Sequence, residues 1–214
     1  MRVRPISGEA LAEELADRIA GWPGGAWVRV AVDGADVARP GELADRLVAP
    51  LRVRGREVLR VSAGDFLRPA SLRLEFGRTD PDVFYDEWLD TKALLREVLE
   101  PLEPGGSGRV LPALWDSAAD RSFRLPYRTL PPGGVLLLDG PLLLGRGLPV
   151  ELAVHVWLSA GALERRTPEE ERWRLPAFAR YEREVRPQEV ADVVVRADHP
   201  DRLAVVEGGR NAGR

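Results

Sequence analysis

The sequence predicts an α/β fold, in which a doubly wound, mostly parallel β-sheet has helices on both faces and a small helical lid. Apolar, β-rich runs alternate with amphipathic helical segments along the chain. The predicted strands at 27–33 and 133–139 run directly into a glycine, which is typical of sheets that bind ligands at the carboxyl ends of their strands. At 214 residues and 44% apolar composition, the chain suits a single domain over 1–214 with a substantial core.

The N-terminal half contains a strand–helix–strand unit. Leucine and isoleucine side chains four residues apart, behind Ser7, predict a helix over 7–20. A strand follows at 27–33, then a helix over 40–51 and a second strand at 57–62. A unit of this size implies two parallel strands joined by a right-handed crossover.

The C-terminal half contains the strongest strand signal, the apolar run 133–139, which we expect at the centre of the sheet. A charged helical stretch over 161–184 is interrupted by Pro168 and Pro176, and it predicts a lid at about 160–184. The remaining predicted elements are a helix over 86–102, a strand over 152–158, a final strand over 191–195 and an unstructured tail at 207–214.

Composition excludes several classes of function. The net charge of −3, without a long basic run, argues against a nucleic acid or anionic membrane partner. The absence of cysteine excludes disulfides, thiolate catalysis and zinc–thiolate sites. No apolar run reaches the length of a membrane span and the N-terminus does not resemble a signal peptide, so we expect a cytoplasmic protein. Lys92 is the sole lysine, so cationic sites must be built from arginine.

The connection between the first strand and its helix lies where a phosphate-binding loop belongs, because backbone N–H groups and a helix N-terminus would bind phosphate there. Aligning Gly34 with the first glycine of Gly-x-x-x-x-Gly-Lys-Ser/Thr puts Arg39, Pro40 and Gly41 at the second glycine, the lysine and the hydroxyl. Arg39 lacks the conformational freedom of glycine, Pro40 supplies neither a cation nor an N–H donor, and Gly41 has no hydroxyl to bind Mg²⁺. The stretch is either an ordinary strand–helix connection or a modified loop in which Arg39 supplies the cation.

Further segments resemble the uridine kinase and phosphoribulokinase group of P-loop proteins. The matching segments are Val-Arg-Val-Ala-Val-Asp-Gly (28–34), Gly-Asp-Phe (64–66), 80–90, Leu-Trp-Asp (114–116), Val-Leu-Leu-Leu-Asp-Gly (135–140), Leu-Glu-Arg-Arg (163–166), and Arg-Pro (186–187) with 191–195. The resemblance covers roughly residues 27 to 196 in the family's order and implies a P-loop NTPase-like fold. The departures are the phosphate loop, an Asp in place of the Glu at 139, and Thr-Pro-Glu-Glu in the lid.

The resemblance also implies roles for individual residues. Asp65 corresponds to the general base for the acceptor hydroxyl, Asp139 to the acid that helps to hold Mg²⁺, and Arg165 and Arg166 to the arginines of the lid. The residues that it implies for the acceptor pocket are Asp82, Tyr85, Trp115, Asp116 and Arg121.

Each of these residues also has a structural interpretation. Asp65 and Asp139 could cap turns, Trp115 could belong to the core or its rim, and the lid arginines could be solvated. His155 and His199 have no His or Cys partner at metal-ligand spacing, so we interpret both as structural.

Three functions remain open at this point. The first is a pseudokinase that binds a nucleoside, nucleotide or similar small polar ligand and needs no certain cofactor. The second is an active nucleoside or small-molecule kinase that uses Mg-ATP with an atypical loop, since phosphoryl transfer depends mostly on positioning and charge. The third is a non-catalytic scaffold with a filled cleft and an exposed apolar patch. A homodimer is compatible with each of them.

Overall fold

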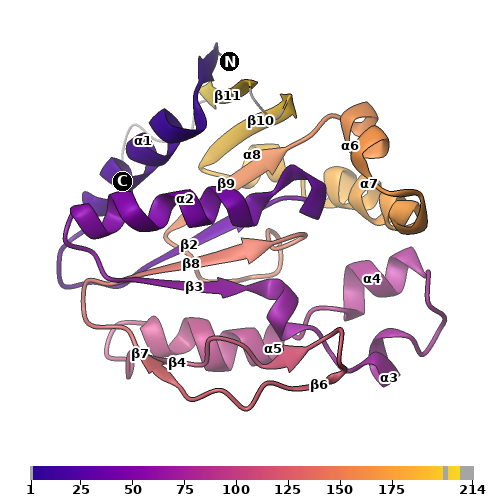
Figure 1. Ribbon diagram of the computed structural model, residues 1–214, viewed down its shortest axis with the longest axis horizontal. Coiled ribbons are helices and arrows are strands. Elements are labelled where there is room, and N and C mark those ends of the chain that lie inside the picture. The colour runs from indigo at the N-terminus through magenta and orange to yellow at the C-terminus, as the bar shows by residue number, and fades with distance from the viewer. Residues whose placement is uncertain (1, 200–201, 208–214) are drawn as a thin grey trace.

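The computed structural model describes residues 2–199 and 202–207, and it has the predicted α/β architecture, with a seven-stranded sheet between layers of helices (Figure 1). The strand order is β1-β11-β10-β9-β2-β8-β3. The strands are β1 (Arg2–Ile6), β2 (Val28–Asp33), β3 (Val58–Ser62), β8 (Val135–Gly140), β9 (Leu152–Trp157), β10 (Val193–His199) and β11 (Arg202–Glu207). From β10 to β3 all neighbours are parallel, whereas β11 runs antiparallel to both β10 and β1.

Helices cover both faces of the sheet, as predicted. The α-helices are α1 (Gly8–Ala20), α2 (Pro40–Val53), α3 (Ala70–Arg73), α4 (Pro81–Glu87), α5 (Thr91–Leu94), α6 (Ala160–Arg166), α7 (Leu175–Glu184) and α8 (Pro187–Val190). Short 3₁₀ segments are η1 (Asp36–Ala38), η2 (Ala63–Phe66), η4 (Glu100–Leu102) and η5 (Glu169–Arg174), and η3 (Leu95–Leu99) is a π-helix. Figure 1 shows α1 and α2 on one side of the sheet and α4 and α5 on the other.

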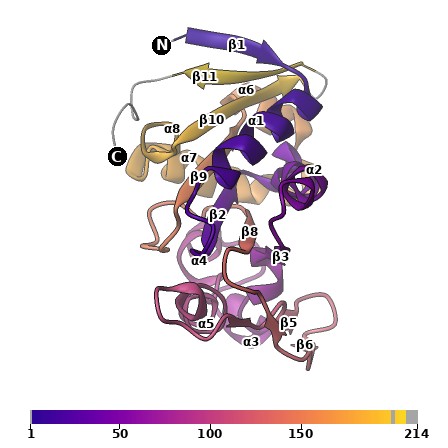
Figure 2. The same cartoon turned by 90° about the vertical axis from the view of Figure 1, so that its left-hand side faces the viewer.

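Two short two-stranded ladders lie beyond the α5 side of the main sheet. They pair β4 (Arg109–Val110) with β7 (Arg128–Thr129) and β5 (Trp115–Asp116) with β6 (Arg121–Ser122). Figure 2 shows the β5–β6 hairpin and α5 at one end of the molecule, with β1 and β11 at the other.

The core consists of two apolar layers, one on each face of the sheet. All residues of β2 and β8 are buried, and alternate residues enter opposite layers: Leu137 packs with α1 and α2, and Leu136 and Leu138 pack with α4, α5 and α7. Burying a leucine or valine fully stabilises the fold by about 1.5–3 kcal/mol per side chain. These central strands therefore form a rigid base for the loops at their carboxyl ends.

The structure corrects four predicted elements. The helix predicted over 86–102 begins at Thr91, because the Asp90 side chain caps it and Leu89 pairs with Leu67 as an isolated bridge. Strand β10 is not the last, since β11 follows it and pairs with β1, which was not predicted. Strand β8 is buried but lies next to the edge strand β3, because β10, β11 and β1 extend the other side of the sheet. The predicted tail overlaps β11 at Glu207, and the rest of it lies outside the described residues.

Candidate functional site

The loop between β2 and α2 makes a close turn against β9. Gly34 approaches β9 so closely that a Cβ there would lie 2.8 Å from the carbonyl oxygen of Val156. Arg39 adopts the left-handed conformation, with φ 59° and ψ 51°, immediately before Pro40 begins α2. This conformation favours glycine. The backbone therefore retains a glycine-like turn at the position where the sequence has an arginine.

Two backbone donors of this loop are engaged within the loop itself. The N–H of Ala38 donates to the carbonyl of Ala35 at 2.7 Å, and the N–H of Arg39 donates to the carbonyl of Asp36 at 2.9 Å. The Arg39 guanidinium forms an ion pair with Glu42 at 3.2 Å, and 64% of its side chain is exposed. Both the N–H groups and the arginine charge thus have partners inside the loop.

Arg60 of β3 contacts both the start of α2 and the end of β8. Its guanidinium donates to Oδ1 of Asp139 at 2.5 Å and to the carbonyl of Gly41 at 3.1 Å, and it also pairs with Asp45. Asp139 follows the apolar run of β8, which is parallel to β3, so both side chains reach the same edge of the sheet. A Cβ on Gly41 would lie 3.1 Å from Oδ2 of Asp139. An arginine therefore neutralises the acid at the carboxyl end of β8.

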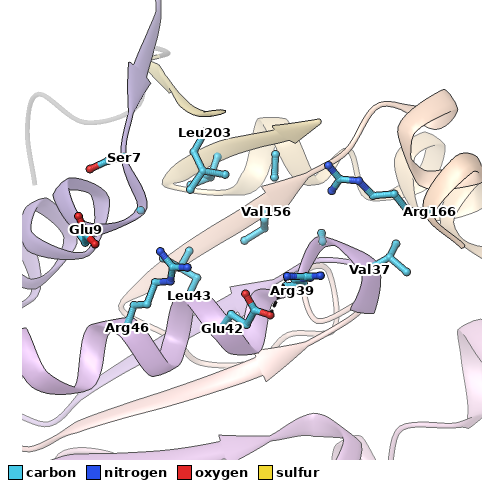
Figure 3. Close-up of a pocket in the computed structure, with 14 residues that line it drawn as sticks. Ser7, Glu9, Val37, Arg39, Glu42, Leu43, Arg46, Val156, Arg166 and Leu203 are labelled. Carbon is cyan, nitrogen blue, oxygen red and sulfur yellow. Dashed lines mark ion pairs between the residues drawn. The ribbon is translucent and has the colours of Figure 1, made fainter. Parts of the chain in front are cut away.

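A cavity of about 610 Å³ lies on the outer side of this loop (Figure 3). Its wall includes the arginines Arg39, Arg46 and Arg166, and Figure 3 shows Arg166 approaching from α6, opposite the Arg39–Glu42 pair. Arg166 also donates to the carbonyl of Asp198 at 2.8 Å. Leu203 of β11 lines the same cavity, so this unpredicted strand helps to close it.

A separate cavity of about 350 Å³ lies on the other side of the loop, at the carboxyl ends of β3 and β8. Asp36 and Asp139 contribute carboxylates to its wall, and Phe84 and Trp88 contribute aromatic rings that pack edge-to-face at 5.2 Å. Asp65 lies beside it in η2, directly after the lining residue Gly64.

The acids of this second cavity are held in an unfavourable environment. Burial raises the pKa of Asp36, Asp65 and Asp139 above its usual range. Arg174 opposes the shift at Asp36 and Arg60 opposes it at Asp139, whereas the neighbouring carboxylates Asp139 and Asp116 add to the shift at Asp65. Perturbed acids gathered at one cavity are typical of functional sites.

Arginines line the same cavity without acidic partners of their own. Arg73 is 7% exposed and donates to the carbonyls of Arg68 and Ser117, and Arg146 donates to the carbonyls of Leu142 and Tyr85. Burial lowers the pKa of both guanidinium groups. Among the described residues, neither forms an ion pair with a carboxylate. These buried cations leave room for an anionic group in the cavity.

The lid contributes a third arginine to this cavity. Arg174, in η5, lies over the rings of Phe84, Trp88 and Trp173 at 5.1–5.4 Å and forms an ion pair with Asp36 at 3.6 Å. Its Nε is buried and has no hydrogen-bond partner among the described residues. Cation–π contacts of this kind hold the lid against α4.

The residues predicted for the acceptor pocket do not gather in one place. Asp82 lies in the first turn of α4 and pairs with Arg180 at 3.2 Å, and Tyr85 packs against Tyr181. Trp115 and Asp116 belong to the β5–β6 hairpin, where Trp115 donates to Asp120 and Asp116 caps the following turn, and Arg121 is exposed in β6. None of these residues lines the 350 Å³ cavity itself.

The remaining predicted site residues lie at the cavity wall and in the lid. Asp139 lines the cavity, and Arg165 and Arg166 end helix α6, which begins the lid.

Among the described residues no three His, Cys, Asp or Glu side chains gather closely enough to hold a metal ion. No helix in the described chain has the length and apolar character to cross a membrane.

Sequence reasoning missed Arg60, which pairs with Asp139, and the cavity arginines Arg73, Arg146 and Arg174. They are spread over β3, α3, the loop after β8 and the lid, so no local spacing relates them. The one available signal was the use of arginine for almost every basic residue.

Comparisons with known proteins were made for sequence and for structure. No protein-family model and no curated protein matches the sequence. Solved structures do match: a possible uridine kinase from Bacillus stearothermophilus at TM-score 0.69 and 18% identity, covering 86% of this chain and 96% of that one. A candidate fructose transport system kinase from Silicibacter sp. TM1040 matches at TM-score 0.55 and 20% identity, over 87% and 95%. The YGR205w protein matches at TM-score 0.61 and 10% identity, over 89% and 93%. The chain therefore has a uridine kinase-like P-loop kinase fold.

Proposed function

We propose that this protein binds a small anionic ligand of the nucleotide class in the 350 Å³ cavity and does not transfer a phosphoryl group from Mg-ATP. The observation that carries the proposal is the contact of Arg60 with Asp139 beside Gly41. In a P-loop kinase this place requires a hydroxyl and an acid around Mg²⁺. Here a fixed guanidinium stands between the acid and the loop.

The residues of the donor side do not fit Mg-ATP. Gly41 has no hydroxyl, Pro40 has neither a cation nor an N–H, and the N–H groups of Ala38 and Arg39 already donate within the loop. Each charge-assisted hydrogen bond that is missing removes on the order of 1.5–3 kcal/mol of phosphate binding. An active kinase with an atypical loop would need a free cation, but Arg39 is paired with Glu42.

The acceptor side supports ligand binding. Arg73 and Arg146 are buried or half-buried without a carboxylate partner, and a bound phosphate or carboxylate would supply the missing negative charge. The buried rings of Phe84 and Trp88, which lie beneath Arg174, give the cavity an apolar wall. The open cavity also argues against a scaffold with a filled cleft.

Isothermal titration with uridine, UMP and Mg-ATP tests this function. We expect saturable binding of UMP, weaker binding of uridine, and no transfer of phosphate to either from Mg-ATP. Micromolar binding of Mg-ATP together with phosphate appearing on an acceptor would show an active kinase and overturn the proposal. If neither uridine nor UMP binds, the ligand assignment fails even if transfer is absent.

A further inference from the structure

A third cavity, outside the sites described above, lies where β9 ends against α6 and α7. Its volume is about 430 Å³, and most of its wall is apolar. The side chains of Leu158, Leu163, Leu175, Phe178 and Ala179 form that wall. In Figure 1, α6 and α7 lie together beyond the carboxyl end of β9. The cavity has room for an apolar body of at least one ring.

One imidazole nitrogen stands unpartnered in this apolar wall. His155 is 4% exposed, and its Nδ1 lies 2.6 Å from Oδ2 of Asp33, which is fully buried. The Nδ1 proton is used in the hydrogen bond to this carboxylate, so in the neutral form of the ring Nε2 is the acceptor. Nε2 is buried and has no hydrogen-bond partner among the described residues. Buried polar atoms are rarely left in this state without a ligand or water.

The orientation of His155 is fixed by a buried network. Asp33 also accepts from the hydroxyl of Tyr181 at 3.1 Å and from the N–H of Leu143 at 2.8 Å. The hydroxyl of Tyr181 in turn accepts from the N–H of Leu144 at 3.0 Å. These bonds hold the ring in one orientation, with Nε2 toward the cavity.

The cavity is also negatively charged. Oε1 of Glu182 lies 4.0 Å from Nε2 of His155, and Glu164 lies in the wall as well. No arginine or lysine is among the described residues that form it. Burial raises the pKa of the Glu182 carboxyl, which a bound cation would reverse.

We propose that this cavity binds a small primary ammonium compound with an apolar, ring-sized body. The ammonium donates one N–H to Nε2 of His155 and another to the carboxylate of Glu182, and the body packs against Leu163 and Phe178. An alcohol has a single proton and cannot donate to both acceptors. An anion would meet the charges of Glu182 and Glu164.

Titration with benzylamine, benzyl alcohol and benzoate tests this assignment, because the three probes share a ring and differ in charge. The chain has only two histidines, so in protein labelled at histidine the ring signal of His155 reports the cavity and that of His199 serves as an internal control. We expect benzylamine to shift the His155 signal saturably, with a Kd of about 1 mM or tighter. Benzyl alcohol should bind about tenfold more weakly, and benzoate should not bind.

Two variants separate binding from loss of fold. Glu182→Gln changes a half-exposed side chain and should weaken benzylamine about tenfold while leaving benzyl alcohol unchanged. Leu163→Trp narrows the cavity and should weaken the binding of both compounds, with the His155 signal otherwise retained. The proposal is overturned if the ammonium has no advantage over the alcohol, if both histidines respond alike, if Glu182→Gln or Leu163→Trp leaves benzylamine binding unchanged, or if nothing binds up to about 10 mM.

Discussion

Nη2 of Arg60 and Oδ1 of Asp139 lie 2.5 Å apart and join neighbouring strands at the edge of the sheet where a P-loop kinase binds metal. The side chain of Asp139 is 10% exposed and that of Arg60 24%, so this ion pair is well shielded from solvent. Its geometry makes the acid a structural partner of β3 as well as a wall of the cavity.

Removing Arg60 should destabilise the protein. In Arg60→Ala the Asp139 carboxylate is left buried without its partner, so we expect a loss of about 1–3 kcal/mol in the free energy of unfolding. Urea denaturation measures the change, and Arg52→Ala, an exposed arginine of α2, is the matched control. Equal effects of the two substitutions would contradict a stabilising role for the pair.

Restoring the phosphate loop should depend on Arg60. The combined change Arg39→Gly, Pro40→Lys and Gly41→Thr returns the motif residues, but the guanidinium of Arg60 still holds Asp139. We expect Mg-ATP binding only when Arg60→Ala is added, with a gain of at least about tenfold in affinity by calorimetry. If the unaltered protein bound Mg-ATP as tightly as the variant that includes Arg60→Ala, this prediction would be refuted.

Glycine should suit position 39 better than alanine. Because Arg39 has φ 59°, Arg39→Gly relieves the left-handed strain, whereas Arg39→Ala keeps the Cβ; both substitutions lose the exposed ion pair with Glu42 equally. Thermal unfolding should show Arg39→Gly more stable than Arg39→Ala by about 1 kcal/mol. If alanine proves as stable as glycine, the loop does not hold this conformation in solution.

Tyr181 should matter for stability through its hydroxyl. Tyr181→Phe leaves the buried N–H of Leu144 without an acceptor and removes a donor to Asp33, so it should cost about 1–2 kcal/mol. Tyr85→Phe is the control, since its hydroxyl has no hydrogen bond among the described residues. Chemical denaturation of both variants compares them, and a neutral Tyr181→Phe would contradict the network.

Asp65 should make stability depend on pH in a defined direction. Its pKa is raised above the ordinary 3.8, so the folded state keeps a proton that the unfolded chain has lost. Its contribution to stability is therefore greatest below pH 3.8 and falls as the pH rises through the interval up to its raised pKa. As the pH rises through that interval, the free energy of unfolding of Asp65→Asn should increase relative to that of the unaltered protein. The variant should therefore be the more stable of the two at pH 7. Glu57→Gln is the exposed control, and a difference that does not vary with pH would contradict the raised pKa.

The nucleotide-class ligand should depend on the charge of Arg146. Arg146→Gln removes a cation that lines the cavity without a carboxylate partner, so the preference for UMP over uridine should fall about tenfold in calorimetric titrations. Arg52→Gln removes an exposed arginine of α2 outside the cavity and should leave the preference unchanged. An unaltered preference in Arg146→Gln would place the anion elsewhere.

The sequence predicted the fold because its central strands are apolar runs that end at a glycine or an acid. It did not predict β1 and β11, because they lie at one edge of the sheet and have charged residues among their apolar ones. Asp139 was identified from the run before it, but its partner Arg60 lies 79 residues away, and the pairing depends on the register of β3 and β8. The predicted acceptor residues still await a ligand test, and a homodimer stays a prediction.

The antiparallel pairing of β1 with β11 joins residues from opposite ends of the described chain. Because β1 has no other neighbour in the sheet, its backbone groups have no partner strand until β11 is synthesised, almost two hundred residues later. The sheet edge and the Leu203 wall of the 610 Å³ cavity are therefore completed only after β11 has been synthesised. A nascent chain arrested before β11 would carry an open edge strand, a site at which sheets recruit other chains.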